Sequence, residues 1–396
     1  MTAPLRIGYI PLVDATTLLV AVDQGFTAAE GLSVELVREV SWSNVRDKLN
    51  IGLFDAAHLL SPVAIASSLG IGHVRVPLIV PFNLGYNGNA ITVSPRLFAA
   101  LLSAGDGDIT DPNVSARALA RVVADRKKRG VETLTFGMTF PFSNHNYQLR
   151  YWMASGGVDP DEDVRLVVLP PPYMVESLVS GHVDGFCVGA PWNSVAVDLG
   201  VGNILHFGCE IMAHVSEKVL ALREHWAGEN HDTVAALVRS MSRASEFVGK
   251  IENRERVVYI VAHRLETLPE LVHRTLGGNL KITPEGAIRK NDSYIVIDRS
   301  RANRPDPVQA AWAYAQIVRW GQAPLSDELQ MTAENVFRPD LYDGAVGNAH
   351  GQAGGGKIAD SVGAFVGPDF EARDIAGYLA AWRNKRVRQP RLSVVR

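Results

Sequence analysis

The sequence predicts an α/β protein with open, largely parallel sheets and helices on both faces. Short apolar strands alternate with helical patterns from residue 5 to about residue 92, and the alternation resumes near residue 134. From about residue 208 onward the pattern is mainly helical. At 396 residues the chain is long enough for two or three units. We therefore expect two α/β units, at 5–92 and 93–207, followed by a mainly helical remainder.

The first unit reads as strand, helix, strand, helix, strand, helix. Its strands are expected at 6–10, 32–37 and 56–60. Its helices are expected at 16–25, 43–51 and 62–69. Polar and apolar residues alternate over 32–37, which indicates a half-exposed edge strand, and Gly25 ends the first helical pattern. Ser41 or Ser43 is a suitable cap for the second helix.

Two further strands, at 78–80 and 90–93, are expected to flank a loop at 83–89. The Asn-Gly sequence in this loop could form a hairpin turn, or it could present amides to a ligand. Residues 103–113 are loop by composition, and 116–129 form an amphipathic helix whose basic end is expected to be solvated.

The second unit is expected to repeat the alternation. Its strands are expected at 134–138, 164–169, 185–188 and 205–207. Helices are expected at 147–155 and from 175 onward, and in the remainder of the chain at 232–248, 255–264, 269–276 and 307–320.

The stretch Phe186–Trp192 ends a buried strand with Gly-Ala-Pro-Trp, which cannot continue as a strand. Gly189 permits close approach of a ligand, and Pro191 has no N–H. Together with the prolines at 170–172, this is a common place for a small ligand, although a plain strand-to-helix turn would look the same.

Composition excludes several classes of protein. The net charge of −3 gives no field that favours nucleic acid, and two cysteines imply no disulfide framework.

No secretory signal precedes the strand at 6–10, and no apolar run approaches the roughly 20 residues that span a bilayer. We therefore expect a protein of the cytoplasm.

Motifs for catalysis and cofactors are weak. Gly351–Lys357 resembles a phosphate-binding loop, but Ile358 replaces the Ser or Thr that would hold magnesium, so a surface loop is expected. His206, Cys209 and His214 match no zinc spacing. No nucleophile elbow or acid–base pair is present. We expect no catalytic residues, no metal and no cofactor.

A set of residues does suit a small planar oxyanion. Such a ligand needs a cation, several N–H donors and a flat wall. Lys218 can supply the charge, and Trp42 can supply the wall. His145, Asn89 and the Gly189 N–H can supply the donors. Spacing alone does not show that these residues converge, and each is also compatible with a structural role.

The chain resembles the nitrate- and bicarbonate-binding solute receptors of ABC importers. The resemblance covers most of the first 230 positions and is carried by motifs at 7–12, 41–48, 55–62, 87–91, 138–141 with His145, 150–157, 170–174, 186–192 and 217–220. It implies a two-lobed, periplasmic-binding-protein-like fold of type II. Lobe one would comprise 5–92 and 208–396, lobe two would comprise 93–207, and the ligand would lie in the cleft between them.

The resemblance also implies ligand contacts at six positions, namely Trp42, Asn89, His145, Pro172, Gly189 and Lys218. Bicarbonate-binding relatives look as though they carry an acidic residue at the position of Lys218, consistent with recruiting calcium. A lysine there suits nitrate or nitrite without a metal.

Because no export signal is expected, the chain looks similar to the cytoplasmic nitrate sensors of the NasS type. That likeness implies a partner, an RNA-binding antitermination regulator of the NasT type, which nitrate or nitrite would release to act on nitrate-assimilation genes. The alternative is a solute-binding receptor of a nitrate or other oxyanion ABC transporter. A third possibility is an enzyme of a related fold that handles thiamin-pyrimidine precursors, for which no catalytic set is seen.

Overall fold

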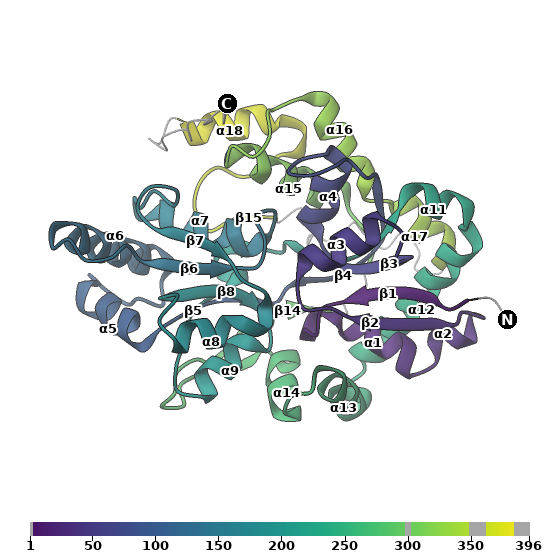
Figure 1. Ribbon diagram of the computed structural model, residues 1–396, viewed down its shortest axis with the longest axis horizontal. Coiled ribbons are helices and arrows are strands. Elements are labelled where there is room, and N and C mark those ends of the chain that lie inside the picture. Colours follow the sequence, from purple (N-terminus) through teal and green to yellow (C-terminus); the bar gives the residue numbers. More distant parts are fainter. Residues whose placement is uncertain (1–2, 298–301, 348–361, 384–396) are drawn as a thin grey trace.

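The computed structural model describes residues 3–297, 302–347 and 362–383, which form two lobes, each built on its own sheet (Figure 1). The Gly-rich stretch at 351–357 and the basic stretch from residue 384 lie outside the described residues. None of the helices in the described part of the chain has the length and apolar character needed to cross a membrane.

Lobe one is built on a six-stranded mixed sheet with the strand order β14-β4-β11-β3-β1-β2. In chain order its strands are β1 (Leu5–Tyr9), β2 (Val34–Arg38), β3 (Ala56–Leu60), β4 (Leu78–Asn87), β11 (Ser216–Arg223) and β14 (Ile295–Val296). β1 pairs in parallel with β2 and β3, whereas β11 lies antiparallel between β3 and β4. The expected edge strand is confirmed, since β2 closes one side of this sheet.

Helices cover both faces of the lobe-one sheet, as the alternating pattern predicts. On one face lie α3 (Trp42–Asn50), α4 (Ser61–Leu69), α15 (Pro307–Arg319) and α16 (Asp327–Val336). On the other lie α1 (Thr16–Asp23), α2 (Phe26–Ala29), α12 (His231–Gly249), α13 (Arg254–Leu265) and α17 (Pro339–Val346). Consecutive side chains of β11 enter different hydrophobic cores, with Val219 in one and Leu220 in the other.

Lobe two is built on a five-stranded sheet with the order β7-β6-β8-β5-β9. Its strands are β5 (Asn89–Val93), β6 (Thr135–Met138), β7 (Arg165–Val168), β8 (Gly185–Gly189) and β9 (Asn203–Phe207). Its helices are α5 (Pro95–Ala104), α6 (Pro112–Lys128), α7 (Asn144–Ser155), α8 (Met174–Val179) and α9 (Trp192–Asp198). β6 is parallel to β7 and β8, and β5 is antiparallel to β8 and β9.

The chain first crosses between the lobes at Gly88, where φ is +99°. The sequence-based division placed 89–92 in lobe one, but β5 pairs with β8 and β9 and so lies in lobe two. The return crossing begins after Phe207, at the expected division, and runs through α10 (Gly208–Ile211) and β10 (Met212–Ala213). Both crossings lie next to the polar cluster described below.

The prediction of a loop at 83–89 is wrong, because β4 continues to Asn87. Pro81 does not end the strand. It lies where two residues of β4 oppose one of β11, between the pairs Ile79–Leu222 and Phe82–Leu220, and such a bulge tolerates a residue without an N–H. The sequence pattern predicts no element at 95–102, where the structure has the helix α5 (Pro95–Ala104).

The largest error concerns β11. The chain from residue 208 was expected to be mainly helical, yet Ser216–Arg223 forms a central strand of the lobe-one sheet, buried along almost its whole length. A strand buried on both faces shows no alternation of polar and apolar residues, so its pattern resembles that of a short buried helix.

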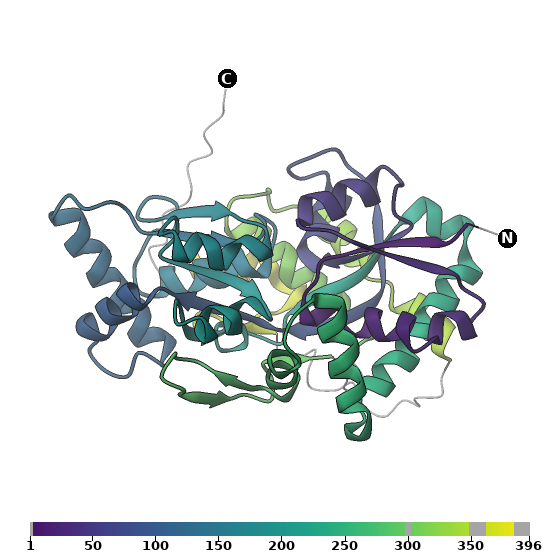
Figure 2. The same cartoon turned by 60° about the horizontal axis from the view of Figure 1, so that its bottom comes forward.

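The remaining C-terminal elements contact both lobes (Figures 1 and 2). The antiparallel ribbon of β12 (Asn279–Lys281) and β13 (Ile288–Lys290) packs beside α9 of lobe two. Tyr151 of α7 packs against Trp312 of α15, Trp320 and Trp382, with ring centroids 6.3, 5.9 and 5.6 Å apart. Trp382 belongs to α18 (Ile375–Arg383). The other short elements are η1 (Val13–Ala15), η2 (Pro171–Tyr173), η3 (Ile251–Asn253), α11 (Glu224–Glu229), α14 (Pro269–Gly277), β15 (Gly363–Ala364) and η5 (Ala372–Asp374).

Candidate functional site

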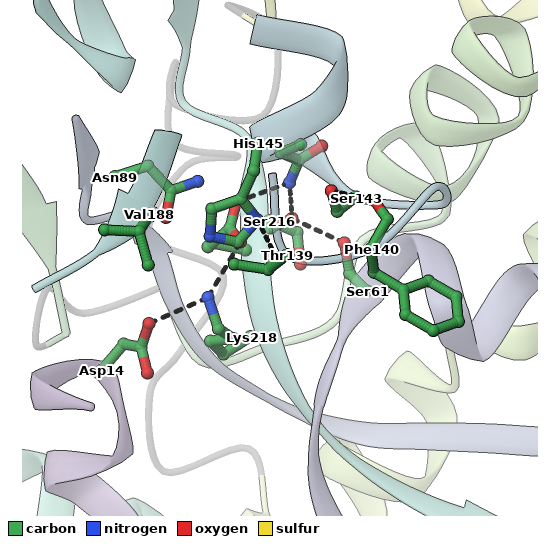
Figure 3. Close-up of polar contacts among 12 residues, drawn as sticks. Asp14, Ser61, Asn89, Thr139, Phe140, Ser143, His145, Val188, Ser216 and Lys218 are labelled. Carbon is green, nitrogen blue, oxygen red and sulfur yellow. Dashed lines mark hydrogen bonds and ion pairs between the residues drawn. The ribbon is translucent and has the colours of Figure 1, made fainter. Parts of the chain in front are cut away.

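A buried cluster of polar side chains lies at the carboxyl ends of the parallel strands of both sheets (Figure 3). In lobe one, Asp14 follows β1, Trp42 begins α3 after β2, and Lys218 lies near the start of the antiparallel β11. In lobe two, Thr139 follows β6 and Gly189 ends β8. Open α/β sheets bind their ligands at this edge, so the cluster is the candidate site.

Lys218 is fully buried and ion-paired. Its Nζ lies 2.9 Å from Asp14 Oδ2, 2.9 Å from Glu217 Oε1, and 5.4 Å from the centre of the Trp42 ring. Burial alone would lower the pKa of Lys218, but the two carboxylates outweigh burial and raise it above its ordinary value. Lys218 therefore keeps its positive charge at neutral pH.

A bulge in β11 brings two consecutive residues into the cluster. The register of β11 against β4 shifts between Ser216 and Lys218, and again between Lys218 and Val219. Successive side chains of a regular strand point to opposite faces, whereas a bulge redirects one of them. Here Glu217 and Lys218 are both completely buried, and Lys218 donates a hydrogen bond to Glu217.

Asp14 also contacts His58 of β3, whose Nε2 lies 3.0 Å from Asp14 Oδ1. Burial would raise the pKa of Asp14, but Lys218 and the hydrogen bond from His58 together lower it to about 2. An ionised carboxylate only accepts hydrogen bonds, so His58 Nε2 donates. Burial lowers the pKa of His58, so its ring is neutral and Nδ1 keeps a lone pair. The ring packs against Trp42, with centroids 5.3 Å apart.

His145 enters the cluster from the first turn of α7. Ser143 caps this helix by accepting a hydrogen bond from the N–H of Asn146, and the helix N-terminus favours negative charge nearby. His145 Nδ1 lies 3.1 Å from Thr139 Oγ1 and 3.6 Å from Glu217 Oε1. Burial lowers the pKa of His145 to about 4, so the ring is neutral at pH 7.

Asn89 and Gly189 face one another as register partners at the ends of β5 and β8. A Cβ atom on Gly189 would lie 3.2 Å from Asp14 Oδ2 and 3.6 Å from Asn89 Oδ1, so any larger residue would crowd the cluster. The Asn89 side chain donates to Gln148 Oε1 at 3.3 Å. Gln148 is a fully buried residue of α7.

Several buried polar atoms of these residues have no hydrogen-bond partner among the residues that the structure describes. Leaving a buried polar atom unpaired costs on the order of 1–3 kcal/mol, so a group of them indicates a polar ligand. The atoms are Trp42 Nε1, His58 Nδ1, Asn89 Oδ1, His145 Nε2 and Gln148 Nε2.

Hydrogen bonds hold the two lobes together beside the cluster. The amide of Asn144 in α7 donates to Glu217 Oε2 at 2.8 Å and to the carbonyl oxygen of Ser216 at 2.9 Å. The N–H of Val13 donates to the carbonyl of Ala190 at 2.9 Å. The structure therefore has the lobes closed over the cluster.

Five of the six residues singled out from the sequence are brought together and buried, namely Trp42, Asn89, His145, Gly189 and Lys218. Pro172 lies in η2, half-buried, after β7 at the same edge of the sheet, and it takes no part in the contacts described above. In the stretch Phe186–Trp192, Cys187 is a fully buried core residue, and Trp192 is half-buried and starts α9.

Sequence reasoning missed Asp14, Glu217, Asn144, Thr139 and Gln148. Asp14 interrupts an otherwise apolar run before α1, and Glu217 directly precedes Lys218 in a buried strand. A lone carboxylate in an apolar stretch is costly unless it is paired, and that signal could have marked both residues.

Residues 1–262 match the model of the NMT1-like family. The chain belongs to this NMT1-like family. Among the relatives of this NMT1-like protein, the nitrate/nitrite binding protein NrtA of Nostoc sp. (strain PCC 7120) is 28% identical over 400 residues, which cover 98% of this chain and 87% of NrtA. The nitrate import ATP-binding protein NrtC of Synechocystis sp. is 31% identical over 395 residues. The match covers 95% of this chain but 54% of NrtC, so the chain spans about half of that relative.

Solved structures confirm the two-lobed, periplasmic-binding-protein-like fold of this NMT1-like protein. The periplasmic nitrate-binding protein NrtA from Synechocystis PCC 6803 superposes with a TM-score of 0.85 at 25% identity, covering 96% of this chain and 98% of NrtA. The ligand-binding component of an ABC-type import system from Staphylococcus aureus gives a TM-score of 0.66 at 17% identity, covering 87% and 99%. The second likeness shows the fold alone.

Proposed function

We propose that this protein binds nitrate or nitrite between its lobes and serves as a solute receptor of an ABC importer. The observation that carries the proposal is the buried cluster itself, in which the Lys218 ammonium lies 5.4 Å from the centre of the Trp42 ring and both Trp42 Nε1 and His145 Nε2 lack a partner among the described residues. The family and the names of the relatives support the same ligand class. An enzymatic role is not part of the proposal.

In this proposal, each of the six residues has a role. Lys218 supplies the positive charge, the Trp42 indole supplies an N–H and a flat wall, and His145 faces the anion through Nε2. Asn89 holds the Gln148 amide in place through its hydrogen bond, the Gly189 backbone lets the ligand approach closely, and Pro172 shapes the neighbouring wall. A planar ion with three or fewer oxygens matches a few fixed polar groups on an aromatic surface.

Titration calorimetry of the purified protein tests the proposal. Nitrate and nitrite should bind, whereas sulfate should not, since a dianion would meet the carboxylates of Asp14 and Glu217. Bicarbonate should be tested with and without calcium. Binding of bicarbonate that needs calcium, without any response to nitrate or nitrite, would contradict the proposed ligand.

The regulatory role implied by the resemblance stays a prediction, as do the cytoplasmic location and the antitermination partner of the NasT type. The relatives reported above are named as import and binding proteins, which supports the receptor role. The two roles differ in a measurable way. If an RNA-binding regulator is released by nitrate, that regulator must weaken the affinity for nitrate by the same factor. Equal nitrate affinities with and without the regulator would exclude the release mechanism.

A further inference from the structure

We propose that the site takes up its monovalent anion together with one proton from solvent, and that His145 holds this proton. The inference rests on the proposed anion-binding function and adds the proton as an obligatory second ligand.

The charge of the cluster is already negative before a ligand binds. The Lys218 ammonium lies between two carboxylates, 2.9 Å from each, so its charge is already matched before any anion arrives. With Asp14 and Glu217 as carboxylates and Lys218 as an ammonium, the cluster has a net charge of −1. A bound monovalent anion would change the net charge to −2, in a site where these side chains are at most 4% exposed. Adding an uncompensated charge to such an interior is strongly unfavourable.

His145 lies where it can hold the proton between Glu217 and the anion. Its Nδ1 lies 3.6 Å from Glu217 Oε1, and its Nε2 is buried and has no hydrogen-bond partner in the described part of the chain. A neutral imidazole has one N–H, whereas the protonated ring has two. Protonation therefore lets Nδ1–H point to Glu217 while Nε2–H donates to the anion. The Thr139 hydroxyl, 3.1 Å from Nδ1, can accept a hydrogen bond as readily as it donates one.

Other ionisable groups near His145 are less suited to take up the proton. Glu217 and Lys218 of β11 and Asp14 of η1 act on the His145 ring. His58 of β3 already donates Nε2–H to Asp14, the carboxylate that Lys218 also contacts, so a proton there would place a second cation on one carboxylate. Cys187 of β8 stays neutral because burial raises the pKa of its thiol well above the ordinary value. His145 instead faces Glu217, which is not the carboxylate that His58 contacts.

Linkage fixes the sign of the effect. In the absence of ligand, burial holds the pKa of His145 at about 4, and an anion against Nε2 raises it. Between the ligand-free and ligand-bound pKa values, each anion that binds draws in one proton. The affinity for nitrate then weakens about tenfold for each unit of rise in pH.

The experiment is calorimetry with nitrate at about pH 6, in buffers whose ionisation enthalpies differ, together with the dissociation constant from about pH 5 to 7. Uptake close to one proton per nitrate, with a dissociation constant that rises about tenfold per pH unit, supports the proposal. Binding without proton uptake overturns it and leaves the proposed function standing. Absence of nitrate or nitrite binding at every pH overturns the proposed function and this inference with it.

Two variants assign the proton. His145→Gln keeps a neutral N–H donor but cannot be protonated, so its weaker binding should be independent of pH. Glu217→Gln removes one carboxylate without changing the shape of the side chain, so it should bind nitrate with little or no proton uptake. Full proton uptake by His145→Gln would overturn the assignment. The matched control is His182→Gln, an exposed histidine in the turn before β8, which should behave like the parent.

Discussion

Lys218 Nζ and Asp14 Oδ2 lie 2.9 Å apart in the closed interior, where Lys218 is not exposed and Asp14 is 4% exposed. The same ammonium also pairs with Glu217. One cation thus has two functions, since it stabilises two buried carboxylates and provides the positive charge of the proposed anion site. Variants can separate these functions.

Lys218→Met should lower the free energy of unfolding by about 3–5 kcal/mol, because it leaves two carboxylates buried without their cation. It should also abolish nitrate binding. Denaturant unfolding and nitrate titration measure the two effects.

The double variant Lys218→Met with Asp14→Asn removes one of the stranded charges. It should recover part of the stability but none of the nitrate affinity. Recovery of nitrate binding in the double variant would show that the Lys218 charge is not what holds the anion.

Asp14→Asn tests the pH dependence of stability. The pKa of Asp14 is about 2 in the folded protein, below its ordinary value of about 3.9. A lowered pKa stabilises the fold above the unfolded value, and this stabilisation is lost as the pH falls through the folded value. The free energy of unfolding of the parent should therefore exceed that of the variant by about 2 kcal/mol near pH 6. This difference should disappear between about pH 4 and 2. A gap that stays constant down to pH 2 would contradict the pairing with Lys218.

Trp42→Phe removes the indole N–H and keeps most of the aromatic wall. Trp42 Nε1 is buried and hydrogen-bonds to none of the described residues, so stability should change little, while nitrate affinity should fall about five- to tenfold for one lost hydrogen bond. Trp42→Ala should weaken binding further and also destabilise the core. Trp312→Phe is the matched control, because Trp312 is equally buried and its N–H also lacks a partner, but it lies in the cluster around Tyr151.

Asn144→Asp tests the closure of the lobes. The Asn144 amide donates to Glu217 across the lobes, whereas an aspartate of the same shape would repel that carboxylate. The variant should open, with a larger radius of gyration in solution scattering and weaker nitrate binding. Asn113→Asp adds the same charge at the exposed start of α6 and should change neither quantity.

Much of the fold follows from local patterns. The alternation that predicts β1, α1, β2, α3, β3 and α4 is confirmed, because each of these elements has a periodic pattern and a recognisable end. β11 could not be found this way. Its run Val219–Leu222 is apolar on both faces. Its partners, β3 and β4, lie more than a hundred residues earlier in the chain, so no local pattern can indicate the pairing.

The site is harder to predict than the fold, since its pairings are long-range. Lys218, His145 and Trp42 stand out by residue type in an anion-binding set. The carboxylates of Asp14 and Glu217 do not, because an anion site gives no reason to look for negative charge. Their apolar surroundings in the sequence indicate carboxylates that need a partner, but the pairing with Lys218 becomes visible only when the bulge in β11 places Lys218 between them.

The helix α7 has a practical consequence for measurement. It carries His145 in its first turn and Tyr151 less than two turns further along, where Tyr151 packs among Trp312, Trp320 and Trp382. A helix moves as a rigid rod, so displacement of α7 at the proposed ligand also shifts Tyr151 against these indoles. Tryptophan emission depends on such packing. We therefore expect intrinsic fluorescence to report movement of lobe two, so that titrations with the proposed ligand need no label.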